Sequence, residues 1–210
     1  MGKENEMAKN NLVPDRIQAV WNILGGDEGI DDILAGKMKV ELTPISKAVS
    51  VALLVMVGTT AVSATTNNFV AKEKFVINTT DGTKVKIYEL GSNFKANFLD
   101  KVEELFSGSE LKIQKLSEGS RDTKIITELG GDEKAETSLT EVFSQMEKQP
   151  NGEKGALLTN GYANIFYCRD VNGVLWAVSV SWDGNGWHVY ADSLDDLSDW
   201  GADRHVFSRN

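Results

Sequence analysis

The chain has 210 residues, of which 41% are hydrophobic and 25% are charged, and its formal net charge is −9. A chain of this length can bury one good core or two small ones, so neither disulfides nor metals are needed to hold the fold. The acidic balance, without clustered lysine and arginine, disfavours nucleic acid as a partner. Cys168 is the only cysteine, which excludes an intramolecular disulfide and leaves the localisation open between cytoplasm and cell envelope.

The N-terminal part predicts a flexible terminus followed by a helical module. Residues 1–14 are polar and without periodicity, which is typical of a frayed end. Apolar residues at helical spacing then predict one helix over 16–24 and a second over 27–34, and glycines follow each of them. Two short helices with one apolar stripe each need a third surface. We therefore expect residues 15–43 to form a small helical hairpin that docks on another surface.

Residues 48–64 carry no charge at seventeen consecutive positions, and we assign them to an apolar connector over 44–68. As a buried strand or helix, the connector would contribute alternate apolar side chains to the core or to a protein interface. These interface candidates are Val49, Val51, Leu53, Val55 and Val57. An export signal is a second alternative, because Lys47 precedes an apolar centre and small residues follow it. A membrane span is the third, although about 20 residues are usual; membrane association through 48–64 therefore stays open.

The region 69–210 predicts an α+β domain, and its first half alternates between strands and helices. Apolar residues on both sides of a glycine-containing turn predict a β-hairpin over 75–88. Periodicity predicts helices over 93–106 and 122–129, with a short strand near Leu111 between them.

The next helix has the clearest start signal in the chain. Ser138 and Glu141 have the spacing of a capping box, which predicts a helix that runs to Lys148. Pro150 and Gly152 then end it.

Short turns and period-two alternation predict an antiparallel sheet over 162–208. Its expected strands are 163–169, 174–182, 187–192 and 205–207, with neighbouring strands paired as a meander. The predicted fold class is therefore α+β, with a small helical N-terminal module, an apolar connector, and a C-terminal domain in which helices pack on an antiparallel β-meander.

Aromatic residues concentrate in this sheet, where acidic loops flank them. Trp187 and Trp200 lie next to glycine turns and carboxylates, and an exposed ring beside carboxylates is a common way to bind a sugar or peptide. The binding candidates are Trp187, Trp200, Tyr190, Asp183 and Asp192. Packing of the rings across the sheet is the alternative.

The sequence carries no catalytic, cofactor or metal signature. Cys168, His188 and Asp192 follow the chain order of some thiol hydrolases, but a cysteine in mid-strand has no helix N-terminus or cation to lower its pKa. Two histidines and one cysteine give no metal-ligand spacing, and the acidic loop lacks the spacing of a calcium loop. We predict no cofactor and no metal site, and we expect Cys168 to be a small hydrophobic residue.

Five short strings carry a resemblance to known sequences. They are NFK at 93–95, AETSL at 135–139, QPNGE at 149–153, LLTNG at 157–161 and VFSRN at 206–210. With them, the region 69–210 resembles a family of small bacterial proteins from environmental genomes that has no assigned activity. The resemblance implies a bacterial origin and a shared domain, but no mechanism. The hairpin over 16–40 is similar to an N-terminal module of such proteins, whereas 48–64 is outside the resemblance.

Two functions are compatible with these features. The leading hypothesis is a non-catalytic structural or protein-interaction protein, in which 48–64 is buried against a protein partner or a second copy. The alternative is an envelope-anchored or secreted domain that binds glycan or peptide through its tryptophan-bearing sheet. An enzyme is disfavoured, because it would require an active site without any linear motif.

Overall fold

The computed structural model describes residues 14–40 and 52–209, which belong to two compact units that divide after Ser50. The predicted flexible terminus, apart from residue 14, lies outside the described residues, as do Val49 and Val51.

The first unit contains two short helices, α1 (Pro14–Ile23) and α2 (Gly26–Leu34). Gly25 links them with a φ of 88°, in the left-handed region that favours glycine. Gly29 is required for a different reason, because a Cβ at this position would lie 1.8 Å from the carbonyl oxygen of Leu24. The glycines of this stretch therefore serve the tight junction between the helices.

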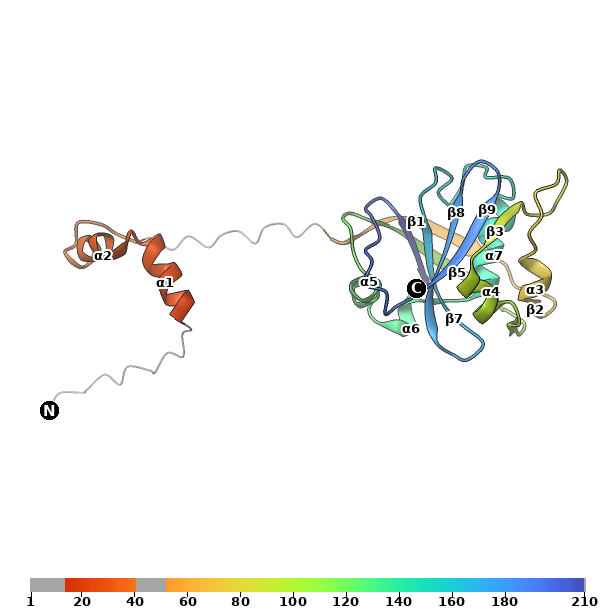
Figure 1. Ribbon diagram of the computed structural model, residues 1–210, viewed down its shortest axis with the longest axis horizontal. Helices are drawn as coiled ribbons and strands as arrows, with labels where there is room; N and C mark the ends of the chain where they lie inside the picture. The colour runs from red at the N-terminus through yellow and green to blue at the C-terminus, as the bar shows by residue number, and fades with distance from the viewer. Residues whose placement is uncertain (1–13, 41–51, 210) are drawn as a thin grey trace. The chain divides into compact units, whose positions relative to one another are not determined.

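The second unit is built around a mixed, mostly antiparallel sheet, which confirms the α+β class in general (Figure 1). Within residues 52–209 this sheet has eight strands. Seven follow in the order β1 (Leu54–Val62), β5 (Ser109–Leu116), β10 (His205–Arg209), β7 (Asn164–Arg169), β8 (Leu175–Trp182), β9 (Trp187–Ser193) and β3 (Ile87–Leu90), while β6 (Glu136–Thr137) pairs with β7. The β10–β7, β9–β3 and β6–β7 pairs are parallel. β2 (Phe69–Val70) and β4 (Val102–Glu103) form a separate two-stranded sheet.

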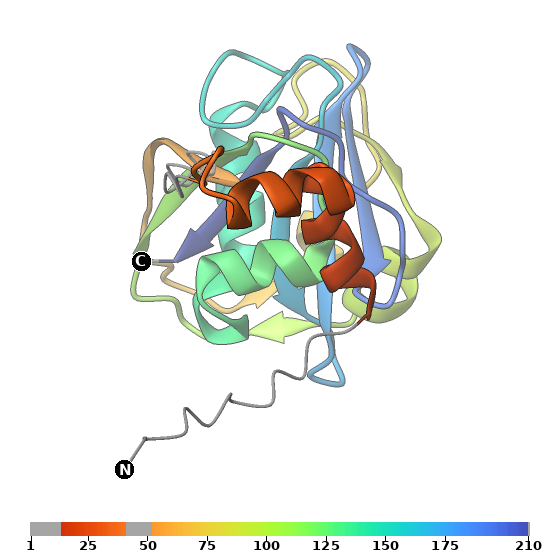
Figure 2. The same cartoon turned by 90° about the vertical axis from the view of Figure 1, so that its left-hand side faces the viewer.

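Helices cover both faces of the large sheet. One face packs against α3 (Ala71–Lys74), α4 (Ser92–Phe98) and α7 (Leu139–Lys148), and the other packs against α5 (Asp122–Leu129) and α6 (Asp132–Ala135). Figure 2, seen from the α5 side, has α5 in front of the strands. Each face has its own hydrophobic core, because alternate residues of a strand point to opposite faces. In β7, Phe166 and Cys168 belong to one core, and Ile165 and Tyr167 belong to the other.

The start of α7 confirms the capping-box prediction. The Ser138 side chain accepts from the Glu141 backbone N–H, and the Glu141 carboxylate accepts from the Ser138 backbone N–H at 2.7 Å. The carboxylate of Glu103 also accepts from the N–H groups of Leu139 (2.9 Å) and Thr140 (2.8 Å). These contacts satisfy N–H groups that have no acceptor within the helix.

Two predictions between residues 75 and 106 are wrong. The expected hairpin over 75–88 is reduced to one bridge between Asn78 and Ile87, because β3 pairs in parallel with β9 instead. The helix expected over 93–106 ends at Phe98. Beyond it, Val102 pairs with Val70 in the small sheet, whereas Leu105 and Phe106 lie in neither a helix nor a strand.

Long-range pairing also changes the expected order of the strands. β10 does not extend a meander beyond β9, since it lies between β5 and β7. Residues 54–62, expected within a connector, form β1 and pair with β5 from Leu54 opposite Leu116 to Val62 opposite Ser109. They are therefore a strand of the same sheet, and not a helix.

Candidate functional site

One edge of the sheet presents apolar side chains to solvent. β1 is the outermost strand, and within 52–209 its only strand partner is β5. Val55, Met56 and Val57 are 41%, 51% and 53% exposed. Leu53 and Leu54, just before them, are buried in the core beneath α5. The strand thus begins in the core and continues along an open edge of the described sheet.

A β-bulge contributes to this exposure. Met56 lies opposite Gln114 and Gly58 lies opposite Ile113, so Val57 has no partner on β5. Leu53 is buried in the core, whereas Val55 and Val57 are exposed, so the two valines stay candidates for an interface. Their edge position and the bulge turn them to solvent.

The C-terminal part of β1 differs, because polar side chains of α7 form hydrogen bonds with it. The ammonium group of Lys148 donates to the Thr60 hydroxyl at 3.1 Å and to the Ala61 carbonyl. The Thr60 hydroxyl in turn donates to Gln145 Oε1 at 2.9 Å. Burial lowers the pKa of Lys148. A lysine at an edge strand is a common protection against pairing. The unprotected part is Leu53–Val57, which we call the apolar edge segment.

The other end of the sheet carries a polar network on β3 and β9. Nε2 of His188 lies 2.9 Å from Asp183 Oδ2, and its Nδ1 lies 3.3 Å from Glu89 Oε2. The Tyr190 hydroxyl donates to the same Glu89 oxygen at 2.9 Å. The rings of Tyr88 and His188 also pack together, with centroids 5.2 Å apart. Each ring nitrogen of His188 therefore faces a carboxylate of the protein itself, as expected of an imidazole with a structural role.

Hydrogen bonds hold the Asp183 carboxylate in its charged form. The backbone N–H of Asn185, with the His188 ring as the next contribution, lowers the pKa of Asp183 to about 2. The pKa of Tyr190 is shifted upward instead, because burial and the Glu89 carboxylate both raise it. The network thus combines an ionised aspartate with a neutral phenol.

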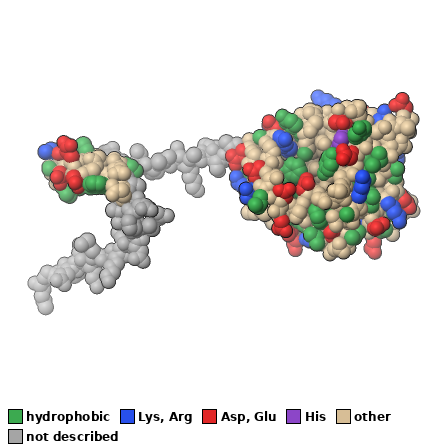
Figure 3. Space-filling model, viewed as in Figure 1, with side chains coloured by type: hydrophobic (Ala, Val, Ile, Leu, Met, Phe, Trp, Pro, Cys, Tyr) green, Lys and Arg blue, Asp and Glu red, His purple; other side chains and the backbone are tan. Residues whose placement is uncertain are grey.

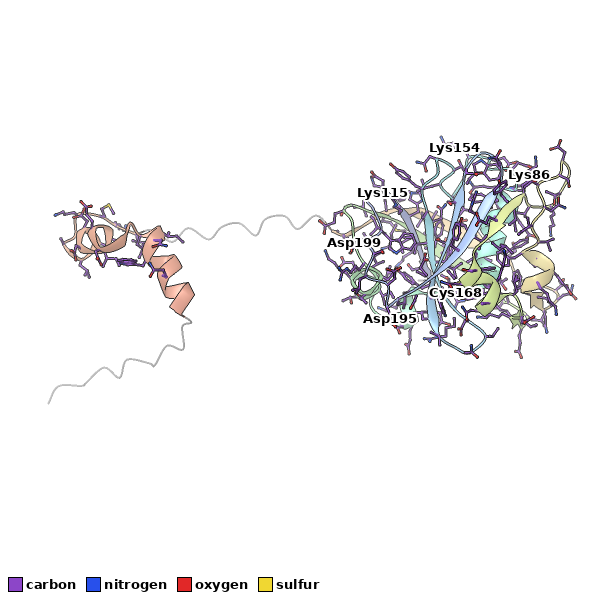
Figure 4. All side chains as sticks on the ribbon, in the orientation of Figure 1. Lys86, Lys115, Lys154, Cys168, Asp195 and Asp199 are labelled. Atoms are coloured by element: carbon purple, nitrogen blue, oxygen red, sulfur yellow. The ribbon has the colours of Figure 1, made fainter. Side chains whose placement is uncertain are left out.

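Two clefts lie beside β9 and share Asp192. The first has a volume of about 470 Å³ and lies between Tyr190 and the start of α4. The second has a volume of about 260 Å³ and is lined by Asp122, Asp192, Asp196, Ser198, Asp199 and Trp200. We call the second the acidic cleft. Asp199 lies on the α5 side of the sheet in Figure 4.

Crowded carboxylates dominate the acidic cleft. Oδ1 of Asp122 accepts from the Tyr167 hydroxyl at 2.8 Å and from the Trp200 indole N–H at 2.7 Å. Burial, with repulsion from Asp196, still raises the pKa of Asp122. The pKa of Asp192 is raised in the same way, by burial first and then by Asp122 and Asp196. Such a cleft favours a cationic group or a hydrogen-bond donor over an anion.

The predicted binding residues are not brought together as one site. Trp187 is fully buried and donates its indole N–H to the Gln149 carbonyl at 3.0 Å, so it offers no ring face to a ligand. Tyr190 lines the first cleft, Trp200 lines the second, and Asp192 lines both. Asp183 joins the polar network instead.

Sequence reasoning missed two residues of these sites, Glu89 and Asp122, and gave His188 no binding role. His188 was considered only with Cys168 and Asp192, although it alternates with Tyr190 and Asp192 on one face of β9. The other two come from β3 and the start of α5, far away in the sequence.

Cys168 lies in the core between the sheet and α7, and its side chain is fully buried. Its sulfur is 3.4 Å from the Thr137 hydroxyl, and burial strongly raises the pKa of the thiol. A nucleophilic cysteine requires a lowered thiol pKa instead.

Across residues 14–40 and 52–209, no group of three or more histidine, cysteine, aspartate and glutamate side chains is arranged to hold a metal ion.

The surface gives no sign of a concentrated basic patch on the face shown in Figure 3, where lysine and arginine side chains are scattered among acidic and apolar ones. In the part of the chain that the structure describes, no helix has the length and apolarity to cross a membrane.

Comparisons with protein-family models, with curated proteins and with solved structures found no match.

Proposed function

We propose that this chain is a non-catalytic protein-interaction module that pairs its apolar edge segment, Leu53–Val57, with an extended segment of a partner protein. The observation that carries the proposal is the exposure of Val55, Met56 and Val57 at the outer edge of the sheet. In strand addition, main-chain hydrogen bonds provide affinity and alternate side chains provide specificity. An edge of this kind offers both.

The contrast within β1 supports this proposal. Apolar edge strands invite aggregation, so proteins usually protect them with charges or cover them. Lys148 protects Thr60 and Ala61, whereas no charged side chain occurs between residues 48 and 64. An interaction role gives a reason for leaving one part of the strand open.

The first unit is included in the proposal as a separate helical module. Ile23 and Leu34 are 81% and 79% exposed. These side chains require a surface that α1 and α2 do not give each other. We propose that α1 and α2 together dock on a partner protein. β1, in contrast, is already paired with β5 in the sheet.

A photo-crosslinking amino acid at position 57 tests the proposal in a bacterial host. The matched control has the same crosslinker at Val76, which is 50% exposed against 53% for Val57 and lies outside the sheet. We expect irradiation to give a discrete crosslinked protein band from position 57 and none from position 76. Mass spectrometry of the band then identifies the peptide at the edge. Equal yields from both positions, or crosslinks to lipid alone, would contradict an interaction role of this edge.

A second candidate function is favoured by the acidic cleft. An indole beside crowded carboxylates is suited to a hydroxyl-rich glycan or to a peptide with a basic side chain. The proposal for this surface is therefore ligand binding through Trp200 and Asp192, without Trp187.

Binding arrays test the second candidate. Arrays of neutral glycans and of lysine- or arginine-containing peptides are probed with the full chain and with Trp200→Ala. We expect the substitution to weaken any specific binding about tenfold, because the indole would supply the stacking surface. Tyr162→Ala is the control, since this ring is 40% exposed and packs against Arg204 outside the clefts. If the Trp200→Ala variant bound as strongly as the wild type, the acidic cleft would be excluded as the binding site.

A further inference from the structure

The apolar edge segment is suited to a second copy of the same chain. We infer that two copies pair antiparallel along Leu53–Val57, so that their sheets join across a two-fold axis. This inference rests on the proposed function, because it names the partner of the same edge.

The sequence of the segment makes it self-complementary. Two identical edge strands that pair antiparallel are related by a two-fold axis, which closes the assembly at two copies. All five residues from Leu53 to Val57 are apolar. In the antiparallel register centred on Val55, Leu53 therefore lies opposite Val57 and Leu54 lies opposite Met56 of the second copy, so apolar residues face apolar residues. A shift by one residue, which exchanges the faces of a mixed strand, causes no polar mismatch here.

The distribution of charge also favours a second copy. Two chains of net charge −9 repel each other in general. Along this edge no side chain adds to the repulsion, because residues 48–64 are uncharged. The β5 neighbours of Val55 and Met56 are Lys115 and Gln114, and Lys115 is paired with Asp203 at 3.1 Å. No acidic side chain of β5 lies opposite these two exposed residues of the segment.

A strand edge favours a polypeptide over a lipid surface. The outer N–H and C=O groups of an edge strand gain hydrogen bonds from another strand, and hydrocarbon supplies none. The bulge at Val57 and the Lys148 contacts limit the pairing to a short segment. A short pairing buries little surface, so we expect a concentration-dependent dimer rather than a permanent one.

Light scattering after size exclusion, applied to the purified full chain over a concentration series, measures the association. We expect a mass that approaches twice 23.0 kDa at high concentration and falls toward 23.0 kDa on dilution. In the register centred on Val55, Met56→Lys places an ammonium group opposite the apolar Leu54 of the second copy and diagonal to the second ammonium group. We therefore expect the dimer to dissociate at a concentration about tenfold higher or more. Val76→Lys, a substitution at a residue of similar exposure outside the sheet, leaves the dimer intact.

Charge exchange separates edge pairing from a general loss of structure. We expect Met56→Glu alone to weaken the dimer as Met56→Lys does, whereas an equimolar mixture of Met56→Lys and Met56→Glu restores a dimer that contains one copy of each. Circular dichroism confirms that both variants fold, as expected for substitutions at a side chain that is 51% exposed.

The outcomes distinguish this inference from the proposed function. A wild-type chain that stays monomeric at every concentration, or variants that associate as the wild type does, overturns the second-copy inference. If position 57 still crosslinks to a different protein in cells, the interaction role of the edge stands and only the partner is wrong. If neither association nor crosslinking involves the edge, both proposals fail.

Discussion

His205 is a half-buried imidazole in β10, with Nδ1 3.2 Å from the carbonyl oxygen of Ala156. Burial lowers its pKa, and the positive charge of Lys115 acts in the same direction. The unfolded chain therefore binds a proton at this side chain at a higher pH than the folded chain does. The contribution of the neutral imidazole to stability is present above the unfolded-state pKa of about 6.5 and is lost as the pH falls below it.

We predict that the free energy of unfolding decreases between about pH 7.5 and 5.5 and that His205→Gln reduces this decrease. Glutamine keeps a polar side chain of similar length but does not titrate. Urea unfolding followed by tryptophan fluorescence at several pH values measures the difference. Asp122 and Asp192, whose pKa values are raised, titrate in both chains, so comparison with wild type isolates the imidazole. An unchanged pH dependence in His205→Gln would refute the assignment.

At the scale of elements, the sequence predicted best where the signal is local. The helix over 122–129 was predicted with the bounds of α5, because its apolar spacing and its terminal glycines lie within ten residues. The capping box located the start of α7 for the same reason. β7, β8 and β9 follow their predicted ranges to within about one residue, since alternation and short turns define them.

The elements that the sequence did not predict depend on distant partners. β3 pairs in parallel with β9, and β1 pairs with β5 about fifty residues further along the chain. No local pattern contains that information, because a strand of apolar residues is compatible with many partners. The candidate sites divide in the same way. Tyr190 and Asp192 were found on their own strand, whereas Glu89 and Asp122 reach the clefts from other elements.

The C-terminal string VFSRN has a structural role that its sequence alone did not reveal. Arg209 at the end of β10 donates to Glu141 through Nε (3.0 Å) and Nη2 (2.8 Å). The buried Glu141 carboxylate also accepts from Ser109 of β5 at 2.6 Å. A fully buried carboxylate needs such partners, because an unpaired charge in the core is costly. The cap of α7 is therefore tied to two strands of the sheet.

At the scale of the whole second unit, β7 connects the two cores. Its residues Ile165 to Cys168 are all fully buried, alternately in the core on the α7 side and in the core on the α5 side. Separation of either helical layer from the sheet would expose one side of this strand. The two cores are therefore expected to unfold together, as in a single cooperative unit.

Cys168 reports on this cooperativity, because it is the only thiol in the chain and lies in β7. We predict that a thiol reagent such as Ellman's reagent modifies the native chain at least about a thousandfold more slowly than the urea-unfolded chain. The physical reasons are complete burial and the raised pKa of the thiol, so modification requires global unfolding. The labelling rate should therefore rise with urea in step with the fluorescence transition. Rapid labelling in native buffer would show that β7 opens locally, which is incompatible with two cores that share it.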